Sequence, residues 1–274
     1  MVTSLRAALA SGIEHLNADG ARLDCQLILG HILNRNRAWL IAHDDEALSL
    51  EQQSVYTELV NQRARGKPMA YILGHQEFWS LQFRVCPDVL IPRPETELLV
   101  EAVLDHRHQP SLIADLGTGT GAIAIALGLE HAEDTIFAMD YSADALSVAA
   151  DNRTRLGASN VHLFRGSWLS AMASSSLDTI VSNPPYIANQ DAHLPALSFE
   201  PLSALVSGND GLDDIRQLIN DAKRCLKSGG LLAMEHGYDQ QAEILELLSQ
   251  AGYRNISGEA DLGGQPRIVL AERP

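Results

Sequence analysis

Basic residues are scarce in this chain, and they form no run anywhere along it. Its 274 residues include 20 Lys and Arg against 35 Asp and Glu, which gives a formal net charge of −15. Non-specific binding to a phosphate backbone depends on the cations that a protein presents, so this balance disfavours duplex DNA as the primary substrate. It fits a protein partner better, particularly one with basic patches.

Cysteine is also rare, with three residues in the whole chain. Cys25, Cys86 and Cys225 are far apart and odd in number, so we expect neither a disulfide framework nor a metal cluster. No apolar run is long enough to span a bilayer, and the first residues lack the pattern of a signal peptide. We therefore expect a cytoplasmic protein without a membrane partner, with two domains or one large domain and an appendage.

The first 74 residues have helical periodicity. Apolar residues fall on one face over residues 5–16, on another face formed by Leu23, Leu27, Ile28 and Ile32, and again over residues 50–64. This pattern predicts a small N-terminal helical bundle over residues 1–74. Residues 77–85 alternate like two strands with a turn near Ser80, so residues 75–92 are expected to form a linking β-hairpin.

Residues 93–274 are predicted to form one α/β domain. Strands expected at 112–116, 135–140, 161–164, 179–182 and 231–234 are separated by helical or irregular stretches, and two final strands, 253–257 and 267–270, follow without a helix between them. Strict alternation of this kind indicates a doubly wound, mostly parallel, seven-stranded, Rossmann-like sheet. The last two strands are expected to form an antiparallel hairpin at one edge.

A glycine-rich loop follows the first of these strands. Gly117-Thr118-Gly119-Thr120-Gly121 opens a helix, and Asp140 ends the next strand nineteen residues later. Glycines allow a sharp turn and close approach of a ligand, and a carboxylate at Asp140 can accept both ribose hydroxyls of a nucleoside. The same features suit a dinucleotide, but Asp115 disfavours a pyrophosphate and favours a cofactor with an amino-acid tail. Trp168 is as compatible with the core as with stacking on adenine.

Asn183-Pro184-Pro185-Tyr186 carries the most specific chemistry. A buried strand is predicted to end at Ser182, because the prolines that follow cannot donate to a sheet ladder. The Asn183 side-chain oxygen and the Pro184 carbonyl are neighbouring acceptors, which suit the NH2 group of a carboxamide or of a base. Tyr186 offers a flat face for either planar group. Ligands bind at this end of the strands in open α/β sheets.

These residues resemble those of class I S-adenosylmethionine-dependent methyltransferases, and more narrowly the protein-(glutamine-N5) methyltransferases of the HemK/PrmC type. The resemblance covers nearly the whole chain and rests on the segments 77–79, 91–97, 115–121, 183–187, 199–201, 204–205 and 210–211. Asn-Pro-Pro-Tyr also occurs in methyltransferases of DNA adenine, whereas Ile91-Pro-Arg-Pro-Glu-Thr-Glu97 with a helical N-terminal domain is narrower. The resemblance implies methylation of the glutamine amide in the Gly-Gly-Gln loop of peptide chain release factors, which supports translation termination.

The resemblance also implies roles for individual residues. The catalytic residues would be Asn183, Pro184 and Tyr186, and Pro185 would join them in binding the substrate. The S-adenosylmethionine site would comprise Gly117, Thr118, Gly119, Thr120, Gly121, Asp140, Trp168 and Asn183. The N-terminal bundle would dock the release factor. Two departures concern Ser167, where an acidic residue is common, and residues 194–198, which lack charge.

Three other functions are compatible with parts of the sequence. A nucleic-acid amino methyltransferase would need a basic groove. A non-catalytic binding module would leave Asn183–Tyr186 without a purpose, and so would an NAD oxidoreductase. No strong general base is required for methyl transfer to an amide, so Glu235 and His236 are interpreted as a strand end and a loop.

Overall fold

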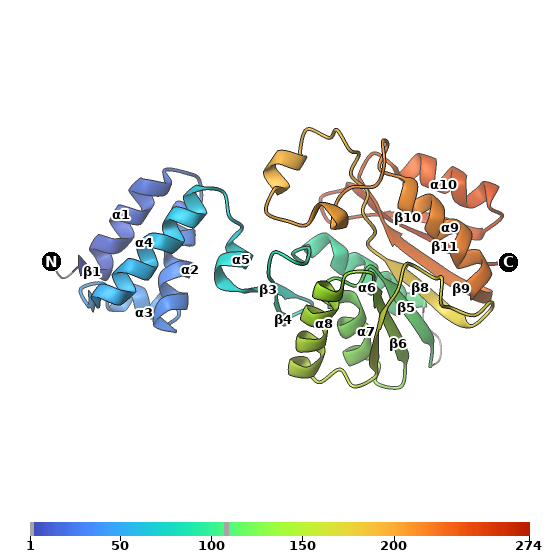
Figure 1. Cartoon of the computed structure of the whole chain (residues 1–274), viewed down its shortest axis with the longest axis horizontal. Coiled ribbons are helices and arrows are strands. Elements are labelled where there is room, and N and C mark those ends of the chain that lie inside the picture. The colour runs from blue at the N-terminus through green and yellow to red at the C-terminus, as the bar shows by residue number, and fades with distance from the viewer. Residues whose placement is uncertain (1–2, 107–109) are drawn as a thin grey trace. The chain divides into compact units, whose positions relative to one another are not determined.

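The structure, a computed structural model, describes residues 3–106 and 110–274, and it divides into two compact units, residues 1–75 and 76–274 (Figure 1). Among the described residues, no helix combines the length and the apolar character needed to cross a membrane.

The first unit is a small helical bundle. Its elements are β1 (Thr3–Ser4), α1 (Leu5–Leu16), α2 (Ala21–Leu33), α3 (Arg37–Ala42), β2 (Ala47–Leu48), α4 (Leu50–Ala64) and α5 (Met69–Leu73). Helix α4 begins at a capping box, in which Ser49 and Gln52 exchange side-chain and backbone hydrogen bonds. The buried core draws on Leu5, Cys25, Ile28, Leu29, Leu40, Tyr56 and Val60.

Two details of the bundle differ from the sequence-based expectation. Leu23 is 42% exposed, because α2 buries Cys25, Ile28 and Leu29 at helical spacing instead. Helices α3 and α5 were not predicted, since six and five residues are too few to establish a periodic pattern.

The second unit contains the predicted sheet. Its elements are β3 (His75–Phe78), β4 (Leu81–Arg84), the 3-10 helix η1 (Pro94–Thr96), α6 (Glu97–His106), β5 (Leu112–Leu116), α7 (Ala122–Glu130), β6 (Thr135–Asp140), α8 (Ala143–Leu156), β7 (Val161–Arg165), β8 (Leu177–Ser182), η2 (Leu194–Leu197), η3 (Leu202–Ala204), α9 (Asp213–Cys225), β9 (Leu226–Glu235), α10 (Gln241–Gln250), β10 (Arg254–Ala260) and β11 (Pro266–Glu272). The seven-stranded sheet has the order β10-β11-β9-β8-β5-β6-β7.

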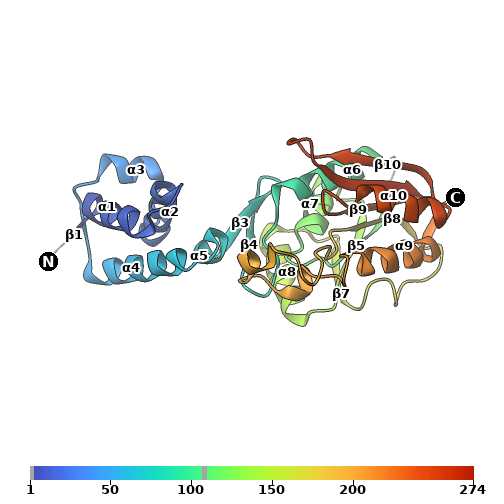
Figure 2. The same cartoon turned by 90° about the horizontal axis from the view of Figure 1, so that it is seen from above.

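Helices cover both faces of this sheet (Figures 1 and 2). Helices α6 and α7 pack with Ile113 of β5 on one face, and α9 and α10 pack with its neighbour Ala114 on the other. Successive residues of a strand point to opposite faces, so β5 is buried on both sides, as expected for a parallel strand. The antiparallel β10–β11 hairpin lies at one edge, as predicted. This is the class I methyltransferase architecture.

The β3–β4 hairpin turns at Trp79 and Ser80, which both have positive φ, at 52° and 55°. Phe78 and Phe83 on either side of the turn are buried in the same core as α6 and α7. The hairpin is therefore packed into the second unit.

The topology aligns the strand ends that carry the predicted motifs. Leu116 of β5 pairs in register with Ser182 of β8 on one side and with Met139 of β6 on the other. The residues that follow, Gly117, Asn183 and Asp140, therefore emerge at the same edge of the sheet, where ligands bind in this class of fold.

Candidate active site

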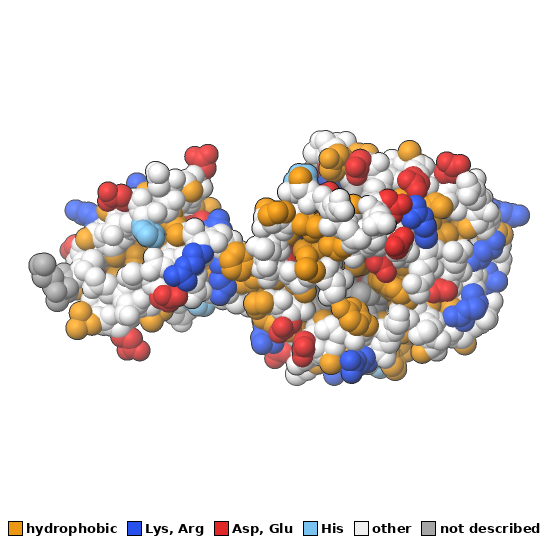
Figure 3. All heavy atoms as spheres, turned by 45° about the horizontal axis from the view of Figure 1, so that its top comes forward, with side chains coloured by type: hydrophobic (Ala, Val, Ile, Leu, Met, Phe, Trp, Pro, Cys, Tyr) orange, Lys and Arg blue, Asp and Glu red, His pale blue; other side chains and the backbone are white. Residues whose placement is uncertain are grey.

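A cavity of about 530 Å³ opens at this edge. Hydrophobic side chains border a hollow in the face of the second unit shown in Figure 3. The cavity is lined by parts of six segments, with Asp214 beyond them: Pro87–Leu90, Gly117 with Gly119, Met139–Ala145, Gly166–Trp168, Asn183 with Pro185, and Pro201–Val206. Its size is typical of a site for a nucleoside-sized ligand.

The glycine loop lines the cavity through two of its predicted residues, Gly117 and Gly119. Both have positive φ, at 71° and 53°, a conformation that costs other residues strain. A Cβ at Gly117 would lie 3.7 Å from the Trp168 ring, so the tryptophan lies against the loop. Gly121 has a different position, because a Cβ there would lie 2.9 Å from Ile125.

Thr118 and Thr120 are buried and are not among the lining residues. The Thr118 hydroxyl donates to Asp115 Oδ2 at 2.6 Å, and the Ala124 N–H donates to the same oxygen at 3.2 Å. Asp115 is fully buried, and burial raises its pKa to about 7. The sequence-based interpretation of Asp115, that it favours a cofactor with an amino-acid tail, stays a prediction; in the structure its carboxylate supports the loop and the start of α7.

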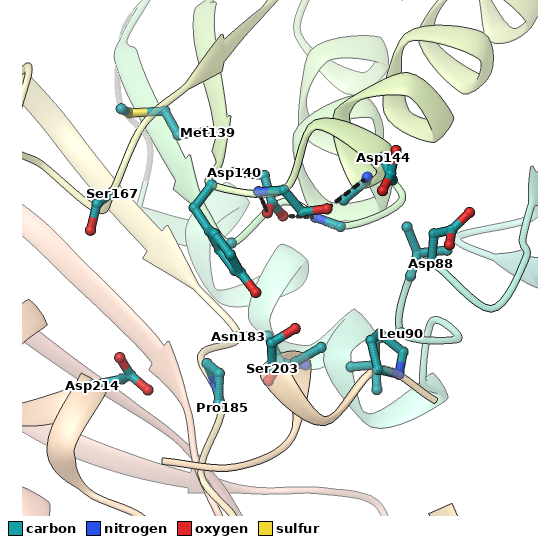
Figure 4. Close-up of a pocket in the computed structure, with 18 of the residues that line it drawn as sticks. Asp88, Leu90, Met139, Asp140, Asp144, Ser167, Asn183, Pro185, Ser203 and Asp214 are labelled. Atoms are coloured by element: carbon teal, nitrogen blue, oxygen red, sulfur yellow. Dashed lines mark hydrogen bonds between the residues drawn. The ribbon is translucent and has the colours of Figure 1, made fainter. Parts of the chain in front are cut away.

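Asp140 occupies the predicted position at the end of β6 and lines the cavity. Its two carboxylate oxygens accept from the backbone N–H groups of Gly119, at 3.0 Å, and Ser142, at 2.9 Å. These bonds fix the carboxylate while leaving it free lone pairs. Figure 4 shows Asp140 across the cavity from Asn183.

Trp168 is half-buried and lines the cavity, with φ of 45°. Ser167 and Gly166 precede it in the cavity wall. Tyr141, which is 57% exposed and directly follows Asp140, also lines the cavity and was not predicted. An aromatic residue directly after the strand end was the available sequence signal for it.

Asn183 lies beside Ser203 and Pro185 in the cavity wall (Figure 4). Its amide nitrogen Nδ2 donates to the Thr96 hydroxyl at 3.2 Å. This hydrogen bond turns the amide nitrogen toward Thr96, so Oδ1 is the side-chain atom that remains to accept from a ligand. Pro184 is buried and, like Tyr186, is not among the lining residues.

Two hydrogen bonds hold Tyr186 in place. Its hydroxyl donates to Glu235 Oε1 at 3.2 Å, and its carbonyl accepts from Gln240 Nε2 at 3.0 Å. Gly211 lies so close that a Cβ there would be 2.2 Å from the Tyr186 carbonyl oxygen. This contact explains why Asp210-Gly211 accompanies the Asn-Pro-Pro-Tyr segment.

Glu235, at the end of β9, forms hydrogen bonds with two residues of the sequence motifs, Thr96 and Tyr186. It is 1% exposed, and it accepts from the Thr96 hydroxyl at 2.6 Å as well as from Tyr186. Burial raises the pKa of Glu235 to about 7, and burial together with this carboxylate raises the pKa of Tyr186. β9 ends at Glu235, as predicted, and His236, which follows the strand, is also fully buried. Sequence reasoning missed Thr96, whose only signal was its place in the 91–97 motif.

Arg93, which the sequence left unexplained between two prolines, forms an ion pair with Glu200. Glu200 Oε2 also accepts from the Ile91 N–H at 3.1 Å. Through these bonds the 91–97 motif meets the 199–201 motif. The two walls that they hold, Pro87–Leu90 and Pro201–Val206, supply lining residues that were not predicted, such as Asp88, Leu90 and Ser203.

Two protein-family models match this chain. Residues 7–74 match the family described as PrmC N-terminal domain, and residues 94–198 match the Methyltransferase small domain. Among solved structures, a methyltransferase from Pyrococcus furiosus has a TM-score of 0.56 at 18% identity, covering 78% of this chain and 98% of that one. The hMettl16 catalytic domain, solved with a MAT2A 3′UTR hairpin, has a TM-score of 0.59 at 16% identity and covers 83% of this chain and 84% of that one. These structures establish the fold.

Curated relatives are much more similar. A Coxiella burnetii protein named release factor glutamine methyltransferase is 44% identical over 92% of both chains. Proteins of the same name from Vibrio cholerae and Escherichia coli K12 are 42% and 41% identical, the first over 99% of this chain and 98% of its own length, the second over 96% of both. The chain therefore belongs to the release factor glutamine methyltransferase family.

Proposed function

We propose that this protein transfers a methyl group from S-adenosylmethionine to the side-chain amide nitrogen (N5) of the glutamine in the Gly-Gly-Gln loop of peptide chain release factors. Family membership supports this reaction. The structural observation that carries it is the orientation of Asn183, whose amide nitrogen is held by Thr96, so that its oxygen remains to accept from a substrate.

The cavity fits the cofactor that this reaction needs. Gly117 and Gly119 bring backbone to its surface without side chains, and Asp140 presents a fixed carboxylate suited to ribose hydroxyls. Trp168 and Tyr141 provide aromatic surface for a base. We assign the cofactor site to these residues together with Asn183, with Thr118, Thr120 and Gly121 shaping the loop from outside the cavity. When bound, the cofactor's sulfonium supplies an electrophilic methyl group.

The residues of the chain act on the substrate amide. An amide nitrogen is a weak nucleophile because its lone pair is delocalised into the carbonyl. Asn183 Oδ1 and the Pro184 carbonyl each accept one hydrogen of the NH2 group, which orients the nitrogen and stabilises the positive charge that develops on it. Pro185 and the fixed Tyr186 complete the pocket, and the walls exclude water. Positioning supplies the remaining rate enhancement. As the new N–CH3 bond forms, the bond from the methyl carbon to sulfur breaks and the positive charge passes from sulfur to the amide nitrogen. The methylated nitrogen then loses one proton to solvent, so no strong general base is needed.

The protein partner is a release factor in the cytoplasm, docked by the N-terminal helical unit. The net charge of −15 favours a partner with basic patches over free nucleic acid.

The proposal is tested by incubating the protein with isotopically labelled S-adenosylmethionine and, separately, a purified release factor, the same factor with the motif glutamine replaced by alanine, bulk DNA and bulk RNA. We expect label in the unmodified release factor alone. Label in DNA or RNA, or equal label in the glutamine-free factor, would contradict it.

Asn183→Ala tests the site, with Asn189→Ala as the matched control. Asn189 is exposed on the same loop, and its side-chain Nδ2 donates to Asn209 Oδ1 at 3.2 Å. With the cofactor at a concentration that calorimetry shows to saturate each variant, we expect Asn183→Ala to reduce single-turnover methyl transfer by about 100-fold or more. Near wild-type transfer by this variant would refute the role of Asn183.

A further inference from the structure

Four side chains form one hydrogen-bonded chain behind the substrate pocket. Asn183 Nδ2 lies 3.2 Å from the Thr96 hydroxyl, which lies 2.6 Å from Glu235 Oε2, and the Tyr186 hydroxyl lies 3.2 Å from Glu235 Oε1. Thr96 is 4% exposed and Glu235 is 1% exposed. The members come from η1, the segment after β8, and the end of β9, which are distant in the sequence.

The direction of each hydrogen bond follows from counting hydrogens. An ionised Glu235 can only accept, so the single hydroxyl hydrogen of Thr96 goes to it across the shorter distance. The Thr96 oxygen must then accept from Asn183, which places the amide nitrogen of Asn183 toward Thr96. The amide oxygen is consequently left on the other side, where the proposed reaction needs an acceptor.

We propose that the Glu235 carboxylate is a positioning residue that sets, through Thr96, which end of the Asn183 amide faces the substrate. This inference rests on the proposed function, because it concerns the same acceptor. When Glu235 takes up a proton on Oε2, it can donate to Thr96, and Thr96 then donates to Asn183. The Asn183 amide is then favoured in the reversed orientation, with its NH2 group toward an NH2 group of the substrate.

The surroundings of Glu235 place this protonation near neutral pH. Burial raises its pKa to about 7, although the Thr96 and Tyr186 hydroxyls and Arg267 act in the lowering direction. The charged groups that act on Glu235 or Tyr186 are Glu95, Arg267 with its partner Asp261, and Arg93 with its partner Glu200. The titratable His236 directly follows Glu235 in the chain. Turnover is expected to fall as the pH drops below about 7, because the ionised form is the competent one.

The Glu235→Gln variant removes the titration. A carboxylate accepts from both Thr96 and Tyr186, whereas one glutamine side chain has a single oxygen, so one of the two donors loses its acceptor. We expect kcat at pH 8 to fall about 10- to 100-fold and to become flat between pH 6 and 8, with KM for the release factor and cofactor affinity nearly unchanged. Glu246→Gln, at an exposed position of α10, is the matched control and keeps the wild-type profile.

The Thr96 variants separate positioning from packing. Thr96→Ser keeps the hydroxyl and should retain nearly full turnover with the wild-type pH profile. Thr96→Val keeps the shape but removes the hydroxyl, and it should lose turnover as Glu235→Gln does. We call the control of the Asn183 orientation by Glu235 through Thr96 the relay. It is overturned if Thr96→Val turns over like the wild type, or if a pH profile with an apparent pKa near 7 persists in Glu235→Gln. Such persistence would point to Asp115, whose pKa is raised to a similar value.

A readout without substrate distinguishes failure of the relay from failure of the proposed function. In protein labelled with 15N-asparagine, the Asn183 side-chain amide signal is assigned by its loss in Asn183→Ala. We expect its chemical shifts to titrate with a midpoint near pH 7 in the wild type and to be constant in Glu235→Gln. If the wild type does not methylate release factors, the proposed function fails, yet this titration still decides the relay; an Asn183 signal indifferent to both pH and Glu235→Gln overturns it.

Discussion

Arg93 and Glu200 are 107 positions apart in the sequence and form an ion pair that joins two walls of the cavity. The Glu200 side chain is 2% exposed, and the Arg93 side chain is 34% exposed. Because Glu200 also accepts from the Ile91 N–H, it fixes the direction of the chain just before η1. A single buried carboxylate thus determines how the segment before α6 meets the loop after η2.

Arg93→Met should be destabilising, because it leaves the Glu200 charge buried without its partner. We expect the free energy of unfolding to fall by about 1–3 kcal/mol, measured by urea denaturation. Adding Glu200→Gln should recover part of the loss, since it removes the unpaired charge. Arg6→Met is the matched control, because the Arg6–Asp44 pair is exposed, with side chains 73% and 36% accessible. Its effect on the free energy of unfolding should be smaller than that of Arg93→Met, because solvent screens an exposed pair, and equal losses in the two single variants would contradict the interpretation.

Ser80→Gly should stabilise the β3–β4 hairpin. Ser80 has φ of 55° in a two-residue turn, a conformation that glycine adopts without strain. Trp79 cannot be exchanged as freely, because its backbone N–H bonds to Glu97 at 2.7 Å and its indole N–H bonds to Glu130 at 2.6 Å. We expect Ser80→Gly to raise the free energy of unfolding by about 0.5–1 kcal/mol in urea denaturation.

Ser80→Ala provides the comparison for this prediction, since alanine keeps the Cβ and the strain but removes the hydroxyl. Its stability should equal that of the wild type. A glycine variant that is no more stable than the alanine variant would show that the turn is unstrained.

Sequence reasoning located the parts of the site that follow directly from local rules. A strand that must stop at prolines placed Asn183, and a glycine run between a strand and a helix placed Gly117 and Gly119. Because parallel strands end at one edge, the pattern also brought Asp140 close to them. Each of these inferences needs only the neighbouring residues and the order of the strands.

The missed residues depend on contacts between segments that share no periodic pattern. Thr96 and Glu235 are 139 positions apart, and nothing near either one in the sequence indicates that they are bonded. Asp88 lines the cavity from a loop and Ser203 from the short helix η3, and the paths of both segments are set by packing and by the Arg93–Glu200 pair. For the same reason, the sequence indicated that Glu235 ends a strand but gave no sign of its hydrogen bonds with Thr96 and Tyr186.

Asp140→Asn should weaken cofactor binding more than it weakens the fold. The carboxylate accepts from the backbone N–H groups of Gly119 and Ser142 on separate oxygens, whereas an asparagine keeps one acceptor. We expect affinity for S-adenosylmethionine, measured by calorimetry, to fall about 10- to 100-fold, with a loss of about 1 kcal/mol in the free energy of unfolding. Asp151→Asn, on the exposed side of α8, should change neither quantity. Wild-type affinity in Asp140→Asn would rule out the assignment of Asp140 to the cofactor site.

Stability should depend on pH through Asp115. Burial raises its pKa from the ordinary 3.8 to about 7, so between these values the folded protein binds a proton that the unfolded chain has released. The free energy of unfolding therefore falls as the pH rises through this range, by up to about 1.4 kcal/mol per pH unit. Glu235 contributes with the same sign from 4.5 to about 7, and buried His236, whose pKa is lowered, contributes with the opposite sign below 6.5.

Asp115→Asn isolates the Asp115 contribution, because Glu235 and His236 remain in both proteins. The asparagine oxygen can still accept from Thr118 and the Ala124 N–H. Relative to this variant, the wild type should lose about 2–4 kcal/mol between pH 4.5 and 7.5, as measured by urea denaturation at several pH values. Carboxylates with lowered pKa values, Asp44, Asp191, Asp210 and Asp261, titrate below this window. Parallel stability curves for the two proteins would mean that Asp115 is ionised in the folded state throughout, held by the hydrogen bonds from Thr118 and Ala124 in spite of its burial.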